Sequence, residues 1–340
     1  MPGDPPGLDL GRLRAYLDDH RPGLVAGELS GTVIAGGRSN LTYNVTDGHV
    51  HLVVRRPPLG HVLATAHDMA REHRVMSALV PTPVPVPRTH ALCEDDTVLG
   101  TPFYVMDKAP GKAFRHAEEL AELGAARTRS ISSTVTDTLA DLHHVDPLEV
   151  GLADFGRPEG FLERQVHRWK KQLDASRTRD LAGIEVLFGY LRANVPPQST
   201  TSIVHGDYRL DNLLIGAGDG VTAVLDWEMA TIGDPLTDVA LMVAYQQMAE
   251  HAGSGAVTDA PRAPGYLQVD EVLARYAGRS GRDLGAMDFY LALAYFKLAV
   301  ILEGIHTRYT EGKTVGAGFA DLGAMVEPLV ATGLRAADMA

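Results

Sequence analysis

Hydrophobic and polar positions divide the chain into two regions of different periodicity. Up to about residue 110, short apolar runs between glycine- or proline-containing segments predict strands at residues 33–35, 41–45, 51–55, 88–92 and 103–107. Two stretches in the same region have helical spacing instead, residues 8–17 and 64–79. Alternate prolines from Pro81 to Pro87 end the second helix and impose an extended connection.

After Pro110-Gly111 the pattern changes to long segments with Leu and Ala at steps of three and four. These predict helices at residues 128–145, 162–173, 184–193, 236–248, 269–277 and 287–306. Short apolar strands are predicted between them at residues 202–205, 213–215 and 222–226. The pattern therefore indicates an α+β, two-lobed fold, with a β-rich lobe at 1–110 and a helical lobe at 111–340.

Composition narrows the class of protein. The chain is 45% hydrophobic and 22% charged, as in globular proteins, and its net charge of −12 argues against a nucleic acid or anionic membrane partner. Its single cysteine, Cys93, excludes an internal disulfide. The apolar run at 289–302 carries Lys297 and is shorter than the roughly 20 residues of a membrane span, so we expect a buried helix and a cytoplasmic protein.

A polar loop between two apolar strands carries the clearest chemical signal. The segment from His205 to Asn212 reads HGDYRLDN, and Asp226 follows a second apolar strand. Phosphoryl transfer needs a carboxylate that accepts the proton of the attacking hydroxyl, and oxygen ligands that hold Mg²⁺ against a triphosphate. We therefore assign Asp207 as the base and Asn212 and Asp226 as metal ligands.

This loop, together with Asp226, resembles the aminoglycoside phosphotransferase and choline kinase-like family, whose members are relatives of the protein kinases. The resemblance extends from about residue 34 to about residue 306 and is strongest to the branch whose kinase domains are also fused to acyl-CoA dehydrogenases. It implies a protein-kinase-like fold, ATP or GTP as the phosphoryl donor, and Mg²⁺.

The N-terminal region contains elements that a nucleotide site requires. A loop with Gly37, Ser39 and Asn40 joins two predicted strands, and its backbone and side chains could cover phosphates, although a Gly-Gly hairpin also serves as a plain turn. Strand alternation lets only one of Arg55 and Arg56 face the ligand. The resemblance selects Arg55, in place of the protein-kinase lysine, and pairs it with Glu72. A solvated surface position is the alternative for both charges.

By the same resemblance, the segment around residues 103–111 is the hinge that meets adenine. Met106 would be the gatekeeper, and the backbone of Asp107 and of Ala109 would pair with the base edge. His205, Asp234 and Asp238 are interpreted as scaffold that orients the loop. Arg209 could bind an anion or pair with Asp211, and both interpretations stay open.

The function predicted from the sequence is an ATP-dependent kinase that phosphorylates a hydroxyl of a small molecule. A nucleotide-binding pseudokinase without turnover and an aminoglycoside-resistance kinase are the alternatives. Few residues separate Asp226 from Asp234, which leaves no room for a peptide-docking activation loop and disfavours a protein kinase. The sequence leaves open the acceptor, its phosphorylated position, the choice of ATP or GTP, and the oligomeric state.

Overall fold

A computed structural model describes residues 4–34, 40–59, 68–197, 200–251, 258–313, 319 and 321–339. The chain forms two compact units. The first comprises Met1–Gly111 and Thr222–Glu228, and the second comprises Lys112–Val221 and Met229–Ala340. The short segment that carries Asp226 therefore belongs with the N-terminal residues, although it follows them far along the chain.

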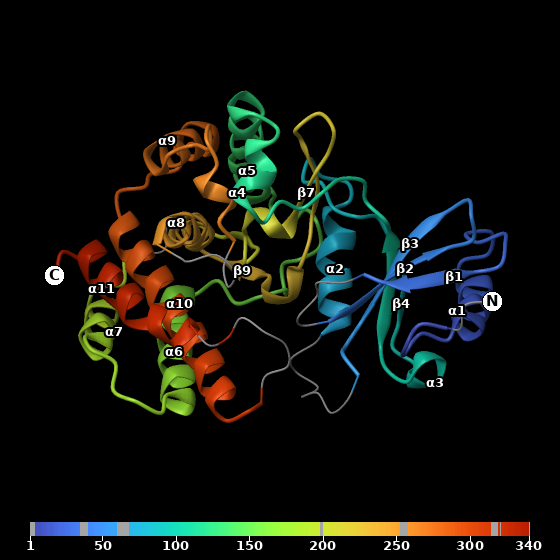
Figure 1. Ribbon diagram of the computed structural model, residues 1–340, viewed down its shortest axis with the longest axis horizontal. Helices are drawn as coiled ribbons and strands as arrows, with labels where there is room; N and C mark the ends of the chain where they lie inside the picture. Colours follow the sequence, from blue (N-terminus) through green and yellow to red (C-terminus); the bar gives the residue numbers. More distant parts are fainter. Residues whose placement is uncertain are drawn as a thin grey trace. The chain divides into compact units, whose positions relative to one another are not determined.

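The first unit is built on an antiparallel sheet (Figure 1), and its strands are hydrogen-bonded in the order β1-β2-β3-β5-β4. Its strands are β1 (Ser30–Val33), β2 (Leu41–Thr46), β3 (His51–Arg56), β4 (Thr89–Cys93) and β5 (Phe103–Asp107). Its helices are α1 (Leu10–His20), α2 (Met69–Leu79) and α3 (Asp96–Leu99), and α2 packs against β4 and β5. The helix predicted at 8–17 and the strands predicted at 41–45, 51–55, 88–92 and 103–107 are present, with ends displaced by a few residues. Strand β1 shares only Val33 with the strand predicted at 33–35, residues 64–67 of the second predicted helix lie outside the described residues, and α3 was not predicted.

The pleat of β3 separates two chemical environments. Leu52 and Val54 join a hydrophobic cluster with Leu13 and Leu17 of α1. Arg55 is on the opposite face, where Thr42 and Tyr104 are its neighbours in the flanking strands. Successive side chains of a strand alternate between faces, so the apolar packing of Val54 directs Arg55 toward α2.

The second unit is mainly helical. Its helices are α4 (Ala117–Ala121), α5 (Ala125–His144), α6 (Phe161–Ser176), α7 (Ile184–Ala193), α8 (Leu236–His251), α9 (Val269–Ser280), α10 (Met287–Thr310) and α11 (Val326–Ala336). Strands β6 (Ser202–Val204) and β9 (Thr231–Gly233) pair antiparallel, and β7 (Leu213–Ile215) follows β6 along the chain. Strand β8 (Val221–Val224) comes next, and all of it but Val221 belongs to the first unit. The six long predicted helices are confirmed. Helices α4 and α11 and strand β9 were not predicted.

Helix α10 is the apolar centre of the second unit and packs against α6, α7, α8 and α11. Within the described ranges it is also the one helix long and apolar enough to cross a membrane, but 72% of its most apolar window is buried inside the fold. This burial is that of a core helix, as the sequence predicts for residues 289–302.

Candidate active site

The loop that follows β6 is shaped by a glycine that no other residue can replace without strain. Gly206 has a φ of +84°, and a Cβ at this position would lie 2.7 Å from the backbone oxygen of Met229. Both features exclude a side chain. The chain therefore turns sharply after His205 and presents Asp207 at the start of the loop, before a 3₁₀ turn at Leu210–Asn212.

The carboxylate of Asp207 is held by two side-chain donors. Its Oδ1 accepts a hydrogen bond of 2.7 Å from the phenol of Tyr245, and its Oδ2 accepts one of 3.1 Å from Nδ2 of Asn212. The same amide nitrogen donates to the backbone oxygen of Asp207 at 3.0 Å. Because the nitrogen side of the Asn212 amide faces Asp207, its oxygen is directed away from Asp207 and suits a hard cation.

Asp238, in the first turn of α8, holds the start of the loop through hydrogen bonds to its backbone. Its carboxylate accepts hydrogen bonds from the backbone N–H groups of His205, at 2.6 Å, and Gly206, at 2.8 Å. It also lies 3.4 Å from Nε2 of His143. Burial alone would raise the pKa of Asp238, but these neighbours together lower it. The scaffold interpretation of Asp238 is therefore confirmed, and its neighbour His143 is buried in the core.

Lys297 is a second residue that holds the loop. In the sequence it stands out only as a charge within an apolar run. Its Nζ donates a hydrogen bond of 2.6 Å to the backbone oxygen of Gly206 and lies 5.4 Å from the centroid of the Trp169 ring. Burial lowers the pKa of Lys297, while the nearby Asp207 and Asp238 oppose that shift. A charged residue in the centre of an otherwise apolar helix was the available signal for this role.

The open question about Arg209 is settled by its contacts. Nε and Nη2 of Arg209 each donate a hydrogen bond of 2.5 Å to the Asp211 carboxylate, and its guanidinium lies 4.7 Å from the Tyr245 ring centroid. This bidentate pair commits Arg209 to Asp211. Because Arg209 stacks on the ring that holds Asp207, it also orients the Tyr245 phenol.

A second cluster, within the first unit, surrounds Arg55. Its Nη2 donates a hydrogen bond of 2.6 Å to Oδ1 of Asp226, and its Nε lies 3.0 Å from Oε2 of Glu72, an ion-pair contact without hydrogen-bond alignment. Glu72 also accepts hydrogen bonds from the Tyr104 phenol, at 2.9 Å, and from Nδ2 of Asn40, at 3.1 Å. The structure thus brings together four of the predicted site residues. It adds Tyr104, which the sequence analysis did not single out.

Among the described residues of this cluster, carboxylates outnumber guanidinium groups. Arg55 faces the carboxylates of Glu72 and Asp226, with Glu228 nearby. Burial raises the pKa of Glu72 to about 7, against the opposing effects of Arg55 and Tyr104, and the neighbouring acids add to the increase. Asp226 is held at a φ of +66°, a conformation that is strained outside glycine and often marks a functional position. A divalent cation bound to oxygen ligands would offset this excess negative charge.

The remaining predicted residues belong to the proposed hinge, which the structure describes, and to the proposed phosphate loop, of which two residues are not described. Met106 is buried at the end of β5, and the backbone N–H of Asp107 donates to the oxygen of Arg88 at 2.8 Å. Asp107 could therefore meet an adenine edge through its carbonyl group rather than its N–H. Ala109 follows the strand and is partly exposed. Gly37 and Ser39 lie outside the described residues.

Across the described ranges, no group of three or more His, Cys, Asp or Glu side chains could hold a metal ion. Transition-metal sites built from His and Cys are thus not present in that part of the chain. Mg²⁺ behaves differently, because it is usually held by one or two protein ligands, water and substrate phosphates. The Asp226 carboxylate and the Asn212 amide oxygen are ligands of the type that Mg²⁺ prefers.

The sequence model of the phosphotransferase enzyme family matches residues 30–290, which include both clusters. The chain belongs to this family. Acyl-CoA dehydrogenase family member 11 from Gallus gallus is 36% identical over 96% of the chain, and acyl-CoA dehydrogenase family member 10 from Mus musculus is 35% identical over 86%. The chain spans 43% and 28% of their respective lengths. The predicted link to kinase domains fused to acyl-CoA dehydrogenases is confirmed.

Solved structures of phosphotransferases have the same fold. A "putative aminoglycoside phosphotransferase" from Ralstonia eutropha superposes with a TM-score of 0.84 at 33% identity, covering 97% of this chain and 98% of that one. A thermostable mutant of aminoglycoside phosphotransferase APH(4)-Ia, in complex with AMP-PNP and hygromycin B, gives 0.63 at 13% identity, with coverage of 95% and 98%. The predicted α+β, protein-kinase-like fold is confirmed. As a member of the phosphotransferase family, this chain is a kinase-type enzyme.

Proposed function

We propose that this phosphotransferase moves the γ-phosphoryl group of ATP or GTP to a hydroxyl of a small molecule, with Asp207 as the general base. The observation that carries the proposal is the carboxylate of Asp207, held between Tyr245 and Asn212 on a loop that Asp238 and Lys297 brace. A base whose two oxygens are fixed in direction is preorganised for an incoming hydroxyl.

The hydrogen bonds to Asp207 leave room for this chemistry. An ionised carboxylate has about four acceptor positions, and Tyr245 and Asn212 occupy one on each oxygen. A remaining lone pair can accept the proton of the acceptor hydroxyl as its oxygen attacks phosphorus. Tyr245 cannot compete as a base, because burial, with the charge of Asp207, raises its pKa well above the usual value and keeps it a donor.

Arg55 is proposed to bind phosphate oxygens of the nucleotide, and Glu72 to hold Arg55 in position. The planar guanidinium already has contacts through two of its nitrogens, and such a fork suits phosphate as well as carboxylate. Mg²⁺ bound together with the nucleotide would supply the positive charge that neutralises the transferring phosphoryl group. The Asn212 amide oxygen and the Asp226 carboxylate are its proposed ligands, together with phosphate oxygens.

The acceptor is proposed to be a small molecule, as it is for the aminoglycoside kinases that share the fold. AMP-PNP in the APH(4)-Ia complex supports the use of a nucleoside triphosphate. The curated relatives are much longer than this chain, and their names refer to acyl-CoA dehydrogenases. Hydroxy acids and hydroxyacyl thioesters of coenzyme A therefore belong in any acceptor screen.

The decisive experiment is transfer of labelled γ-phosphate from Mg²⁺-ATP and Mg²⁺-GTP to aminoglycosides, amino alcohols, sugars, hydroxy acids and hydroxyacyl-CoA. We expect one class to be phosphorylated by the wild-type protein and by Asp180→Asn, a control at an exposed position. Asp207→Asn should bind nucleotide with unchanged affinity and lose nearly all transfer. Nucleotide binding without transfer to any acceptor would favour the pseudokinase alternative, and efficient labelling of a polypeptide would contradict a small-molecule acceptor.

A further inference from the structure

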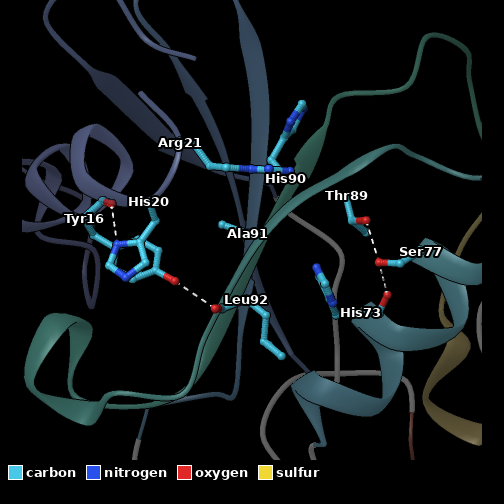
Figure 2. Close-up of a pocket in the computed structure, with 9 residues that line it drawn as sticks. All are labelled: Tyr16, His20, Arg21, His73, Ser77, Thr89, His90, Ala91 and Leu92. Atoms are coloured by element: carbon cyan, nitrogen blue, oxygen red, sulfur yellow. Dashed lines mark hydrogen bonds between the residues drawn. The ribbon is translucent and has the colours of Figure 1, made fainter. Parts of the chain in front are cut away.

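A cavity of about 310 Å³, largely open to solvent, lies within the first unit and is lined by none of the residues proposed to bind nucleotide. Figure 2 shows that residues of α1 border one side and residues of α2 the other, with β4 between them. Its volume is at the lower end of the range for small-molecule sites, roughly 300–1,000 Å³. We call it the α1–α2 cavity. Neither the family match nor the proposed function assigns it a role.

Positive and imidazole groups dominate the polar lining of the α1–α2 cavity. Arg21, at the end of α1, has no carboxylate partner within the described part of the chain, and neither ring nitrogen of His73 has a hydrogen bond there. His20 and His90 complete the set. None of the nine lining residues is an acid, although Asp19 lies 3.4 Å from His20 and Asp107 bonds His90 at 2.6 Å.

Arg21 and His73 both line the cavity, and no carboxylate of the described residues pairs with either side chain. Burial lowers the pKa of His73, and the positive charge of Arg21 lowers it further. An anion bound by both side chains would favour the protonated form of His73 and accept hydrogen bonds from both. The fork of a guanidinium pairs best with oxyanions that offer two oxygens in one plane, such as a phosphate group.

The rest of the cavity wall suits an organic group. The rings of Tyr16 and His20 are stacked, with centroids 4.1 Å apart, and the Tyr16 phenol donates to the backbone oxygen of Leu92 at 2.8 Å. This bond fixes a flat aromatic surface beside Ala91 and Leu92. The hydroxyls of Ser77 and Thr89 bond each other, and Ser77 bonds the His73 oxygen, so neither has a hydrogen left to donate to an anion.

We propose that the α1–α2 cavity binds a small organic phosphate, with the phosphate group between Arg21 and His73 and the organic part against the Tyr16–His20 rings. The stacked Tyr16–His20 rings beside the cationic lining are the reason for choosing a phosphate ester rather than inorganic phosphate. A phosphate monoester carries a second negative charge that a carboxylate lacks. A site with one arginine and several imidazoles should therefore bind the phosphate monoester more tightly.

Occupancy of the cavity is expected to change nucleotide affinity, a consequence that rests on the proposed function. His73 adjoins Glu72 on α2, and its ring packs edge-on to Tyr104, the residue that bonds Glu72. His90 bonds Asp107, whose backbone is the proposed adenine contact. A ligand that fixes His73 and His90 therefore acts on two elements of the nucleotide site, which is the physical requirement for coupling.

Binding is tested by titrating phenyl phosphate, with inorganic phosphate and chloride at matched ionic strength as comparisons. The readout is the proton resonances of the histidine rings, assigned with His73→Asn and His90→Asn variants. We expect phenyl phosphate to shift the His20, His73 and His90 signals with a lower Kd than inorganic phosphate. Arg21→Gln should raise that Kd at least tenfold, and Arg12→Gln, on the same helix but outside the cavity, should not.

Equal Kd values for wild type and Arg21→Gln, or shifts confined to other histidines, would overturn the proposed site. Coupling is tested by the nucleotide Kd with and without saturating phenyl phosphate. It should change severalfold in the wild type and not in Arg21→Gln. If phenyl phosphate shifts the His73 signals but leaves the nucleotide Kd unchanged, the coupling is overturned and the binding site is not. Phosphoryl transfer by Asp207→Asn tests the proposed function and not the α1–α2 cavity.

Discussion

The phenol of Tyr245, on α8, donates a hydrogen bond of 2.7 Å to Oδ1 of Asp207, a residue 38 positions earlier in the chain. The Tyr245 ring also supports the guanidinium of Arg209. One side chain therefore links the proposed base to the ion pair that closes the loop. Buried hydrogen bonds to a charged group are worth about 1.5–3 kcal/mol, so this contact is large enough to matter for catalysis.

Tyr245→Phe removes this hydrogen bond and keeps the ring on which Arg209 stacks. We expect kcat for phosphoryl transfer to fall roughly tenfold or more, since about 1.4 kcal/mol corresponds to a factor of ten. The nucleotide KM should change little, because neither Tyr245 nor Asp207 is among the proposed nucleotide contacts. Tyr309→Phe, at a half-exposed position of the same unit, is the matched control. A Tyr245→Phe enzyme with wild-type kcat would show that the contact is only structural.

The Arg55→Lys substitution keeps the positive charge at this position and removes the planar guanidinium. Arg55 reaches Asp226 with Nη2 and Glu72 with Nε, and a single ammonium nitrogen is not able to reproduce two contacts set by a rigid plane. The expected result is about tenfold weaker nucleotide binding, measured by calorimetry. Arg88→Lys, at an exposed position, serves as control. Unchanged affinity in Arg55→Lys would remove Arg55 from the proposed phosphate contacts.

Glu72 predicts a specific dependence of stability on pH. Burial raises its pKa to about 7 in the folded protein, above the value of about 4.5 for an unperturbed glutamate. The folded state therefore binds the proton more tightly, and this contribution to stability is complete below about pH 4.5 and is lost as pH rises to about 7. Across that window, the free energy of unfolding of the wild type should fall by roughly 3 kcal/mol relative to Glu72→Gln.

Denaturant unfolding of both proteins between pH 4.5 and pH 8 measures this difference. Glu72→Gln keeps the size of the side chain and a partner for Tyr104, so its own stability should change less across the window. Parallel stability curves for the two proteins would mean that Glu72 is ionised throughout, and that Arg55 outweighs burial. Addition of Mg²⁺-nucleotide should reduce the pH dependence of the wild type, because it offsets the excess negative charge.

Removal of the Asp238 carboxylate should destabilise the second unit. Asp238→Ala leaves the buried N–H groups of His205 and Gly206 without an acceptor, and each such loss costs about 1–3 kcal/mol. We expect the free energy of unfolding to fall by about 3 kcal/mol, against less than 0.5 kcal/mol for the exposed control Asp180→Ala. Equal stability of the two variants would contradict the bracing role.

Local patterns were sufficient for most elements of the fold. Strands β2, β3 and β5 and helix α7 begin and end within a residue of their predicted bounds, because alternation and helical spacing are properties of a few neighbouring residues. Helix α11 has such a pattern, with Val326, Leu329 and Val330 buried, and the sequence prediction omitted it. The other two missed elements of the second unit lack one. Helix α4 buries only Leu120, and β9 is a three-residue strand that depends on pairing with β6.

The sequence by itself determined the chemical types at the candidate site: Asp207 and Asn212 on one polar loop, Asp226 after an apolar strand, and two adjacent arginines on β3, of which the family resemblance selected Arg55. Only the tertiary structure decided that Arg209 pairs with Asp211, that Asp226 and Glu72 share Arg55, and that Tyr245 and Lys297 hold the loop. Tyr245 and Lys297 lie in helices whose spacing predicts burial. Which polar group a buried side chain meets depends on the packing of segments distant in sequence, and no local pattern records that distance.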